Sequence, residues 1–177
     1  DCGSNIGSSC EYFSRIFENI YSILVEPNKE NAEFCKKNIY NKNYQILNNA
    51  ISSEKKIVKI NDKTQDYRAF RVDPFIGKDV ETNTVNNILS NNKEFKSFII
   101  KIDIEGYEDN LFKKNFEWIN EFEIIIIEIH DWMLPYKSTS NNFFKALNET
   151  MQNNFKRDII ISGENLILIK NNPIEIY

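Results

Sequence analysis

The chain opens on a glycine-bearing turn, Asp1-Cys2-Gly3-Ser4-Asn5-Ile6-Gly7, that runs directly into a helical pattern. A carboxylate, Glu26, follows about 20 residues later at the end of a short β-branched run, the spacing at which open α/β sheets bind ribose hydroxyls. Small residues in such a turn let the backbone approach a nucleoside-containing ligand. Because the turn normally follows a buried strand, we expect an α/β sheet whose first strand is missing, either lost or left outside a fragment.

Segments with the apolar spacing of a helix alternate with short apolar runs typical of strands along the first part of the chain. Apolar residues recur at three- and four-residue steps in 6–19 and 29–40, which predicts helices with one stripe facing a core, Cys10 included. Residues 21–27 and 44–49 are short apolar runs that predict buried strands. Helices and strands joined by links of a few residues indicate βαβ units, and hence a parallel sheet covered on both faces.

The second half of the chain continues this alternation and then ends differently. The predicted elements are a strand at 98–104, a helix at 108–119, a near-central strand at 122–129, a helix at 141–154 and a hairpin at 158–169. Residues 124–127 are too apolar for a solvent-exposed strand. The stretch 52–97 predicts a hairpin excursion in which 56–60 pairs with 67–72. The predicted fold class is therefore α/β, with a mostly parallel sheet that ends in an antiparallel hairpin.

Composition limits the partners and the compartment. The chain has 177 residues with 41% hydrophobic content, which suits a single domain, 1–177, shortened at its N-terminus. Its net charge of -4 offers no global positive field for nucleic acid. With three Cys outside CxxC spacing and one His, neither a disulfide framework nor a Cys/His zinc site is indicated. No apolar run reaches the roughly 18 residues of a membrane span, so we expect a cytoplasmic protein without membrane partners, its oligomeric state left open.

Charged residues gather at the ends of the predicted strands, where ligands bind in open α/β sheets. Alternation places Lys101, Asp103 and Glu105 on one face of a buried strand, which is costly unless they are paired or ligand-bound. Glu128 and His130 lie two apart on the next strand, and His130 can take a proton from a hydroxyl. The alternatives are a Lys-Asp ion pair covered by a helix and a histidine that merely belongs to a loop.

Two features argue against a nicotinamide-dependent oxidoreductase. The opening turn has Gly-x-x-x-Gly at Gly3 and Gly7, where the dinucleotide fingerprint requires Gly-x-Gly-x-x-Gly. The terminal hairpin also departs from a plain dinucleotide-binding sheet. There are two alternatives to a ligand site. One is that the glycines serve only the turn's conformation, and the other is that Glu26 is a solvated residue before Pro27.

Five segments together resemble the FkbM family of S-adenosylmethionine-dependent methyltransferases. In chain order they are Asp1-x-Gly3-x-Asn5-x-Gly7, Glu26-Pro27, Asn49-Ala50, Lys101-x-Asp103-x-Glu105-Gly106-x-Glu108 and Glu128-x-His130. The resemblance spans nearly the whole chain, and its most specific part is the Lys-Ile-Asp-Ile-Glu-Gly-x-Glu block. It implies a class I, Rossmann-like methyltransferase sheet and methyl transfer to a hydroxyl oxygen of a sugar, glycan or polyketide-type acceptor.

The resemblance also implies roles for single residues. Those that would line the methionine end of the cofactor, S-adenosylmethionine, are Asp1, Gly3, Asn5 and Gly7. Glu26 would hold the ribose hydroxyls, and Asn49-Ala50 would lie beside the adenine. Asp103, Glu105 and His130 would face the acceptor.

Methyl transfer to an aliphatic hydroxyl requires in-line placement and proton removal, because a hydroxyl is a poor nucleophile at neutral pH. We predict that His130 or Asp103 is the base and that Glu105 or Glu128 orients it. Asp103, Glu105 and Glu128 could together hold a magnesium ion, because hard cations take carboxylates, but nothing in the spacing requires one, and no metal ligand is predicted. The rival hypothesis is a catalytically incomplete domain that keeps the fold and serves at most as a binding module.

Overall fold

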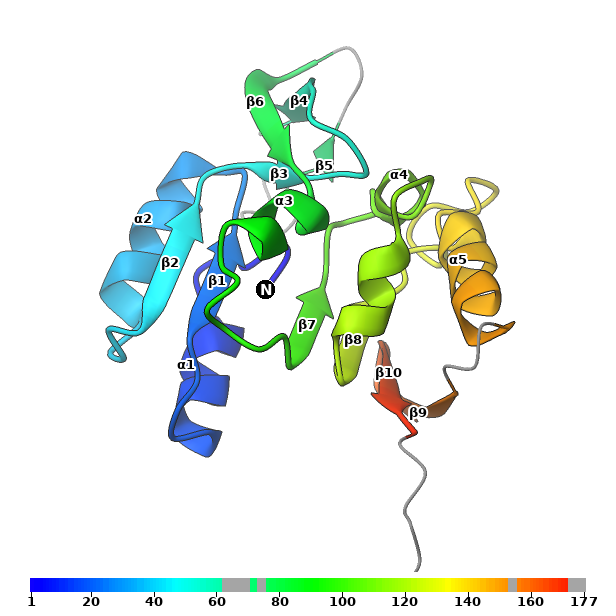
Figure 1. Ribbon diagram of the computed structural model, residues 1–177. Helices are drawn as coiled ribbons and strands as arrows, with labels where there is room; N and C mark the ends of the chain where they lie inside the picture. The colour runs from blue at the N-terminus through cyan, green and yellow to red at the C-terminus, as the bar shows by residue number, and fades with distance from the viewer. Residues whose placement is uncertain (62–70, 73–75, 153–155, 172–177) are drawn as a thin grey trace, which may run out of the picture.

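The computed structural model describes residues 1–61, 71–72, 76–152 and 156–171. Its first elements are α1 (Ser8–Ile16), β1 (Ser22–Val25), α2 (Lys29–Asn38) and β2 (Tyr44–Leu47). β1 and β2 pair in parallel, as the alternation predicts (Figure 1). α1 is shorter than the predicted 6–19, because the backbone is left-handed at Gly7 and extended at Phe17.

The next segment forms a second, mostly antiparallel sheet. It contains β3 (Ala50–Ile51), β4 (Ile57–Asn61), β5 (Arg71–Val72) and β6 (Lys78–Asn83), in the order β3-β6-β4-β5, and α3 (Val85–Ser90) follows. The predicted pairing of β4 with a strand that ends at Val72 is confirmed, although 67–70 lie outside the described residues. The sequence missed β6, which pairs with β4 from Lys78 to Glu81.

The remaining strands return to the first sheet. They are β7 (Ile99–Ile102), β8 (Ile124–Glu128), β9 (Arg157–Ser162) and β10 (Asn165–Lys170). β7 and β8 are parallel, whereas β10 is antiparallel to both β8 and β9. The terminal hairpin is therefore confirmed, as is the central place of β8 between β7 and β10. The fold is mixed α/β.

The predicted helix at 108–119 is wrong. Its residues form one short helix, α4 (Glu108–Leu111), and then a 3-10 helix, η1 (Glu117–Glu121). Between them Asn115 adopts a φ of 57°, a left-handed conformation that interrupts helical hydrogen bonding and that Asn tolerates better than most residues. The apolar spacing continues across the break, since Phe112 and Trp118 are both buried, and this continuity produces the incorrect prediction.

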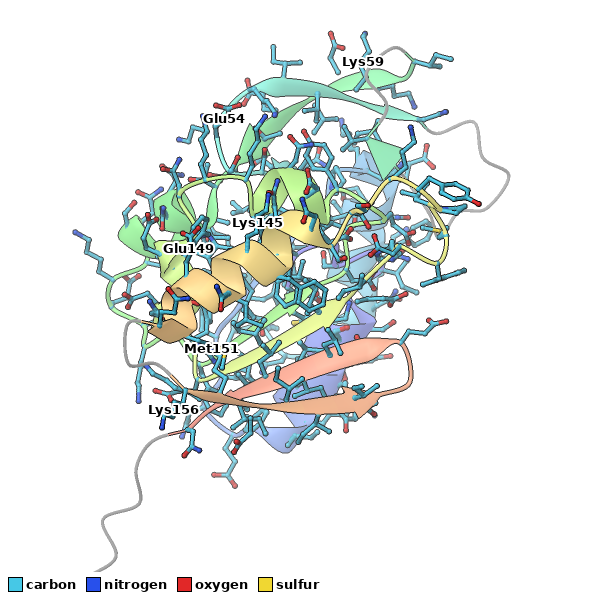
Figure 2. All side chains as sticks on the ribbon, turned by 90° about the vertical axis from the view of Figure 1, so that its right-hand side faces the viewer. Glu54, Lys59, Lys145, Glu149, Met151 and Lys156 are labelled. Atoms are coloured by element: carbon cyan, nitrogen blue, oxygen red, sulfur yellow. The ribbon has the colours of Figure 1, made fainter. Side chains whose placement is uncertain are left out.

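The helix α5 (Asn141–Gln152) packs against α4 and η1 (Figure 2). Phe143 and Leu147 are buried on one stripe, and Met151 packs against the same core. Lys145 and Glu149 lie on the outer side of the helix. The predicted stripe is thus confirmed, while 153–154 of the predicted helix lie outside the described residues.

The sheet around β1 is covered on both faces. Leu24 packs in a cluster with Cys10 of α1 and Cys35 of α2, whereas Val25 belongs to the main core together with Val85 of α3. Because successive strand residues point to opposite faces, α1 and α2 cover one face and α3 covers the other. Among the described residues, no helix has the length and apolar character needed to cross a membrane.

Cys2 joins the two parts of this sheet. It forms isolated parallel bridges with Val25 of β1 and with Ile102 of β7, so the order is β2-β1-Cys2-β7-β8-β10-β9. Apart from Cys2, the described residues place no strand between β1 and β7. The N-terminus lies in this gap (Figure 1).

Candidate functional site

The opening turn is fixed by contacts with the ends of β1 and β7. Gly3 has a φ of 79°, and a Cβ there would lie 1.7 Å from the carbonyl oxygen of Asp103. Only glycine therefore lets these two segments meet. Gly7, with a φ of 85°, precedes α1, and a Cβ there would lie 2.9 Å from the Ile39 side chain. Both glycines serve the packing of the turn, and Gly3 also lines a pocket.

Glu26 is buried at the end of β1, with 4% of its surface exposed. One carboxylate oxygen accepts the backbone N–H of Asn5 and the other accepts that of Asn28, each at 2.8 Å. Burial raises the pKa of Glu26 to about 7, although these hydrogen bonds oppose the rise. The side chain of Asn31 also hydrogen-bonds to this carboxylate, so at least one lone pair remains for a ligand hydroxyl. The alternative of a solvated glutamate is wrong.

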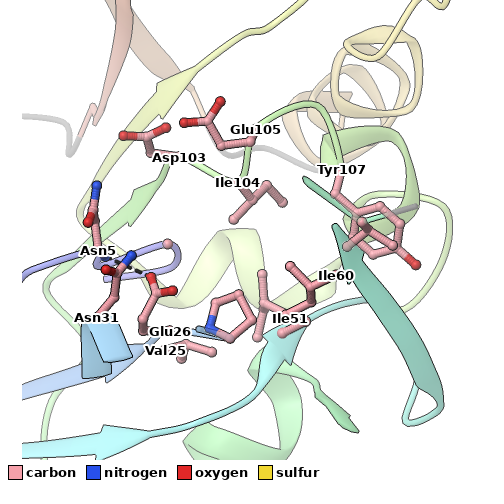
Figure 3. A pocket seen from close by; sticks show the side chains of 14 residues that line it. Asn5, Val25, Glu26, Asn31, Ile51, Ile60, Asp103, Ile104, Glu105 and Tyr107 are labelled. Carbon is pink, nitrogen blue, oxygen red and sulfur yellow. Dashed lines mark hydrogen bonds between the residues drawn. The ribbon is translucent and has the colours of Figure 1, made fainter. Parts of the chain in front are cut away.

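A small pocket lies beside Glu26 (Figure 3). In the figure Asn5 and Glu26 stand on one side of it, Ile60 and Tyr107 on the other. Of the residues predicted to bind a cofactor, those that line it are Gly3, Asn5, Glu26 and Ala50. The pocket volume is about 60 Å³. Since ligand sites usually measure about 300 Å³ or more, a nucleoside-sized ligand requires this pocket to widen.

The other predicted cofactor residues make different contacts. Gly7 packs against Ile39, as described above. The Asn49 amide donates to the carbonyl of Glu81 at 3.2 Å, which ties it to β6. Both carboxylate oxygens of Asp1 are buried and have no hydrogen-bond partner among the described residues. A buried acceptor without a donor is costly. Of these three residues, Asp1 is therefore the one whose side chain can accept a hydrogen bond from a ligand.

Three carboxylates from the ends of β7 and β8 converge on His130. The Nε2 atom lies 3.6 Å from Asp103 Oδ1, 3.8 Å from Glu105 Oε2 and 3.5 Å from Glu128 Oε1. The Lys101 ammonium group donates to Asp103 at 2.9 Å, so the predicted Lys-Asp ion pair is present, as part of a larger cluster. His130 does lie in a loop, two residues beyond the end of β8 rather than on the strand, but it is only 2% exposed and is surrounded by these carboxylates.

His130 is oriented by a carboxylate to which the sequence analysis assigned no role. Its Nδ1 lies 2.8 Å from Oε1 of Glu108, a residue with no exposed surface. Since a carboxylate accepts, Nδ1 carries the proton and Nε2 is directed toward the other carboxylates. Burial lowers the pKa of His130, but the hydrogen bond and charge of Glu108, with the charges of Glu105 and Glu128, outweigh it and raise the pKa.

The surroundings of this cluster are both buried and strained. Burial, with the charge of Asp103, raises the pKa of Glu128. Glu105 has a φ of 54° and is followed by Gly106 at 93°, so two successive residues are left-handed. A non-glycine residue in this conformation costs about 1 kcal/mol, and such strain is typical of functional sites.

Asp103, Glu105 and His130 are also the residues most suited to a metal ion in the described part of the chain. Each offers one ligand atom, and these atoms lie within 4.8 Å of one another. The Lys101 ammonium group already supplies positive charge to Asp103. Independence from metal stays a prediction.

Sequence reasoning missed Glu108, Asn31 and Tyr107 as site residues. Glu108 closes the charged block at 101–108, but a glutamate in the first turn of a helix usually faces solvent, and only the fold buries it. Asn31 is 7% exposed and lines the pocket with Tyr107. Nothing in the local pattern distinguishes these two from ordinary helix and turn residues.

Comparison with known proteins gives a family and a fold. Residues 1–157 match the profile described as "Methyltransferase FkbM domain". The structure is similar to the crystal structure of methyltransferase FkbM from Methylobacillus flagellatus KT, with a TM-score of 0.63 and 14% sequence identity. The match covers 96% of this chain and 42% of that one, so the chain spans less than half of that protein. At this identity the similarity shows the fold alone. No curated protein matches the chain.

Proposed function

The chain belongs to the FkbM methyltransferase domain family, and from this premise we propose that it transfers a methyl group from S-adenosylmethionine to a hydroxyl group. The proposed acceptor is a sugar, glycan or polyketide-type molecule. One observation carries the proposal: Asp103, Glu105 and Glu128 converge on the buried imidazole of His130, and two of these carboxylates line the pocket that contains Glu26.

The residues around Glu26 fit the nucleoside part of the cofactor. Glu26 retains a lone pair for a ribose hydroxyl, and donation by this hydroxyl would stabilise its ionised form. Asp1, with its unpaired carboxylate oxygens, is assigned to the methionine end. When bound, the cofactor would supply a methyl group on a positively charged sulfur. Ile60 and Tyr107 border the pocket opposite Glu26, so they are the side chains expected to move as it widens.

His130 is the better placed of the two candidate bases. Its Nδ1 proton is held by Glu108, so Nε2 is the atom that takes the hydroxyl proton of the acceptor. Asp103 already accepts a hydrogen bond from Lys101. Glu105 and Glu128 would stabilise the imidazolium ion that forms, because opposite charges at this distance favour it.

Transfer of a labelled methyl group tests the proposal. The chain is incubated with saturating S-adenosylmethionine, tritiated in its methyl group, and a panel of soluble saccharides and nucleotide sugars. We expect label in a saccharide hydroxyl and a loss of about 10²- to 10⁴-fold in His130→Gln. Glu121→Gln, which changes an exposed residue of η1, is the matched control.

The same assay examines the carboxylates. Asp103→Asn, Glu105→Gln and Glu128→Gln are each expected to reduce turnover at saturating cofactor. If all three, together with His130→Gln, turn over at the rate of the unaltered chain, the catalytic assignment is wrong.

A catalytically incomplete domain is the second candidate, and the small volume of the pocket favours it. Calorimetric titration with S-adenosylhomocysteine separates the two. Binding that weakens in Glu26→Gln but not in Glu30→Gln, an exposed glutamate of α2, supports the enzyme. The absence of binding supports the incomplete domain.

A further inference from the structure

The strand β9 forms one edge of the main sheet (Figure 1). In the described part of the chain it pairs with β10 on one side and with no strand on the other. Three consecutive residues on it are exposed, Ile159 by 52%, Ile160 by 47% and Ile161 by 75%. Edge strands usually carry Lys, Pro or a bulge that prevents pairing with another chain. This part of β9 has an isoleucine run and an unbroken register instead, so it can accept a further strand.

The hydrogen-bond register shows which backbone groups of β9 are available. The N–H of Asn171 donates to the carbonyl of Lys156 at 2.8 Å, and these residues lie opposite each other where the β9–β10 register continues. Opposite residues of antiparallel strands exchange hydrogen bonds at every second position. The even-numbered residues of β9 therefore face β10, whereas Ile159 and Ile161 direct their N–H and carbonyl groups away from the sheet.

The side chains of β9 are apolar on both faces of the sheet. Ile160 lies opposite Ile167 of β10, which lies opposite Ile126 of β8, so a row of isoleucines crosses the sheet and ends at its edge. On the other face Ile159 lies opposite Leu168, which is fully buried in the main core. A strand that adds to β9 must therefore offer apolar side chains at consecutive positions. The sequence of β9 itself meets this requirement.

We propose that β9 pairs in antiparallel with β9 of a second copy of this chain, about a two-fold axis that passes through the pair of Ile160 residues. In this register Ile159 of each copy lies opposite Ile161 of the other, and both have backbone groups directed outward to form the hydrogen bonds. The row of isoleucines then continues from one sheet into the other. The inference concerns assembly and is independent of the proposed function.

Charges favour this register over its neighbours. It places Asp158 opposite Ser162 of the second copy, and it brings Lys156 beside Glu164, a pair of exposed opposite charges at each end. A shift by two residues in one direction places Asp158 opposite Ile160, and a shift in the other direction places it beside Glu164, which has the same charge. Because one short strand from each copy contributes, we expect a dimer that dissociates on dilution.

Sedimentation of the chain over a wide range of concentration tests the pairing. Ile160→Lys places two ammonium groups opposite each other at the axis and should weaken dimerisation by about 100-fold or more. Ile161→Pro removes an N–H that makes no hydrogen bond to β10, so it should weaken the dimer while the hairpin is kept. Ile57→Lys, at an isoleucine of β4 that is 67% exposed, is the matched control and should dimerise as the unaltered chain does. Unchanged circular dichroism shows that each variant is folded.

A disulfide tests the register. In an antiparallel pair without hydrogen bonds, such as the proposed pair of Ile160 residues, the Cα atoms are about 4.5 Å apart, within the range of a disulfide. Oxidation with diamide should therefore cross-link Ile160→Cys between copies and leave Ile57→Cys uncross-linked. The native cysteines are all buried and should not contribute.

Three results would overturn the proposal. A chain that sediments as a monomer at every concentration would do so, and slow amide exchange at Ile159 and Ile161 in that monomer would assign the edge to another segment of the same chain. A dimer that neither Ile160→Lys nor Ile161→Pro weakens would place the interface elsewhere. Equal cross-linking of Ile160→Cys and Ile57→Cys would indicate random collision.

Discussion

Replacing Glu26 with Gln should change how the free energy of unfolding depends on pH. In the folded chain, burial raises the pKa of Glu26 from 4.5 to about 7, so the native state binds this proton more tightly than the unfolded state does. A carboxyl group with a raised pKa therefore costs stability as the pH rises from 4.5 to 7. The full cost, reached above pH 7, is about 3 kcal/mol.

Urea unfolding at pH 5 and pH 8 measures this effect. The unaltered chain should lose about 2.5 kcal/mol relative to Glu26→Gln between these two pH values, because Gln does not ionise. The quantity to compare is the change in the free energy of unfolding between pH 5 and pH 8. The difference at a single pH also includes a lost bond, since Gln can accept only one of the N–H groups that Asn5 and Asn28 donate. Glu30→Gln, on the exposed side of α2, should follow the unaltered chain at both values.

A difference between the unaltered chain and Glu26→Gln that is equal at pH 5 and pH 8 would show that the pKa of Glu26 is not raised by folding. The experiment also connects to the proposed ligand. Hydroxyl donors stabilise an ionised carboxylate, so saturating S-adenosylhomocysteine should reduce the change with pH.

Three other changes have defined outcomes. Glu108→Gln removes the main charge that raises the pKa of His130, so the pH at which turnover rises should fall by about one unit; an unchanged midpoint would show that the profile does not report His130. Gly3→Ala should lower the free energy of unfolding by about 3 kcal/mol, since its Cβ meets a backbone oxygen. Gly163→Ala, also at positive φ but in open space, should cost about 1 kcal/mol, and equal losses would contradict the packing argument. Treatment with EDTA should leave turnover unchanged, and a loss restored by Mg²⁺ or Mn²⁺ would place a metal at Asp103, Glu105 and His130.

Much of the main sheet is predictable because buried strands have distinctive sequences. The isoleucine run of β8 and the turn at Gly163 identify a central strand and a hairpin without other information. β6 has no such signal. Its sequence, Lys-Asp-Val-Glu-Thr-Asn, is mainly polar, and it is a strand because β4 and β3 pair with it on either side. Pairing of this kind is tertiary information.

The candidate site divides in the same way. Asp103, Glu105, Glu128 and His130 are predictable because charges at the ends of buried strands need a reason to be there. Glu108 is not predictable, since its burial depends on how the turn at Gly106 places α4 beneath His130. The side chain of Asn49 donates a hydrogen bond to a carbonyl of β6. Because the sequence did not predict β6, the orientation of this side chain could not be predicted either.

We have proposed that the pocket beside Glu26 holds the methyl donor next to the His130 cluster. A crystal structure of the chain in complex with S-adenosylhomocysteine would locate the donor. We expect a ribose hydroxyl within about 3.2 Å of the Glu26 carboxylate and the sulfur on the side of Asp103 and His130. A ligand bound with its ribose away from Glu26, or in another part of the protein, would show that the proposed donor site is wrong.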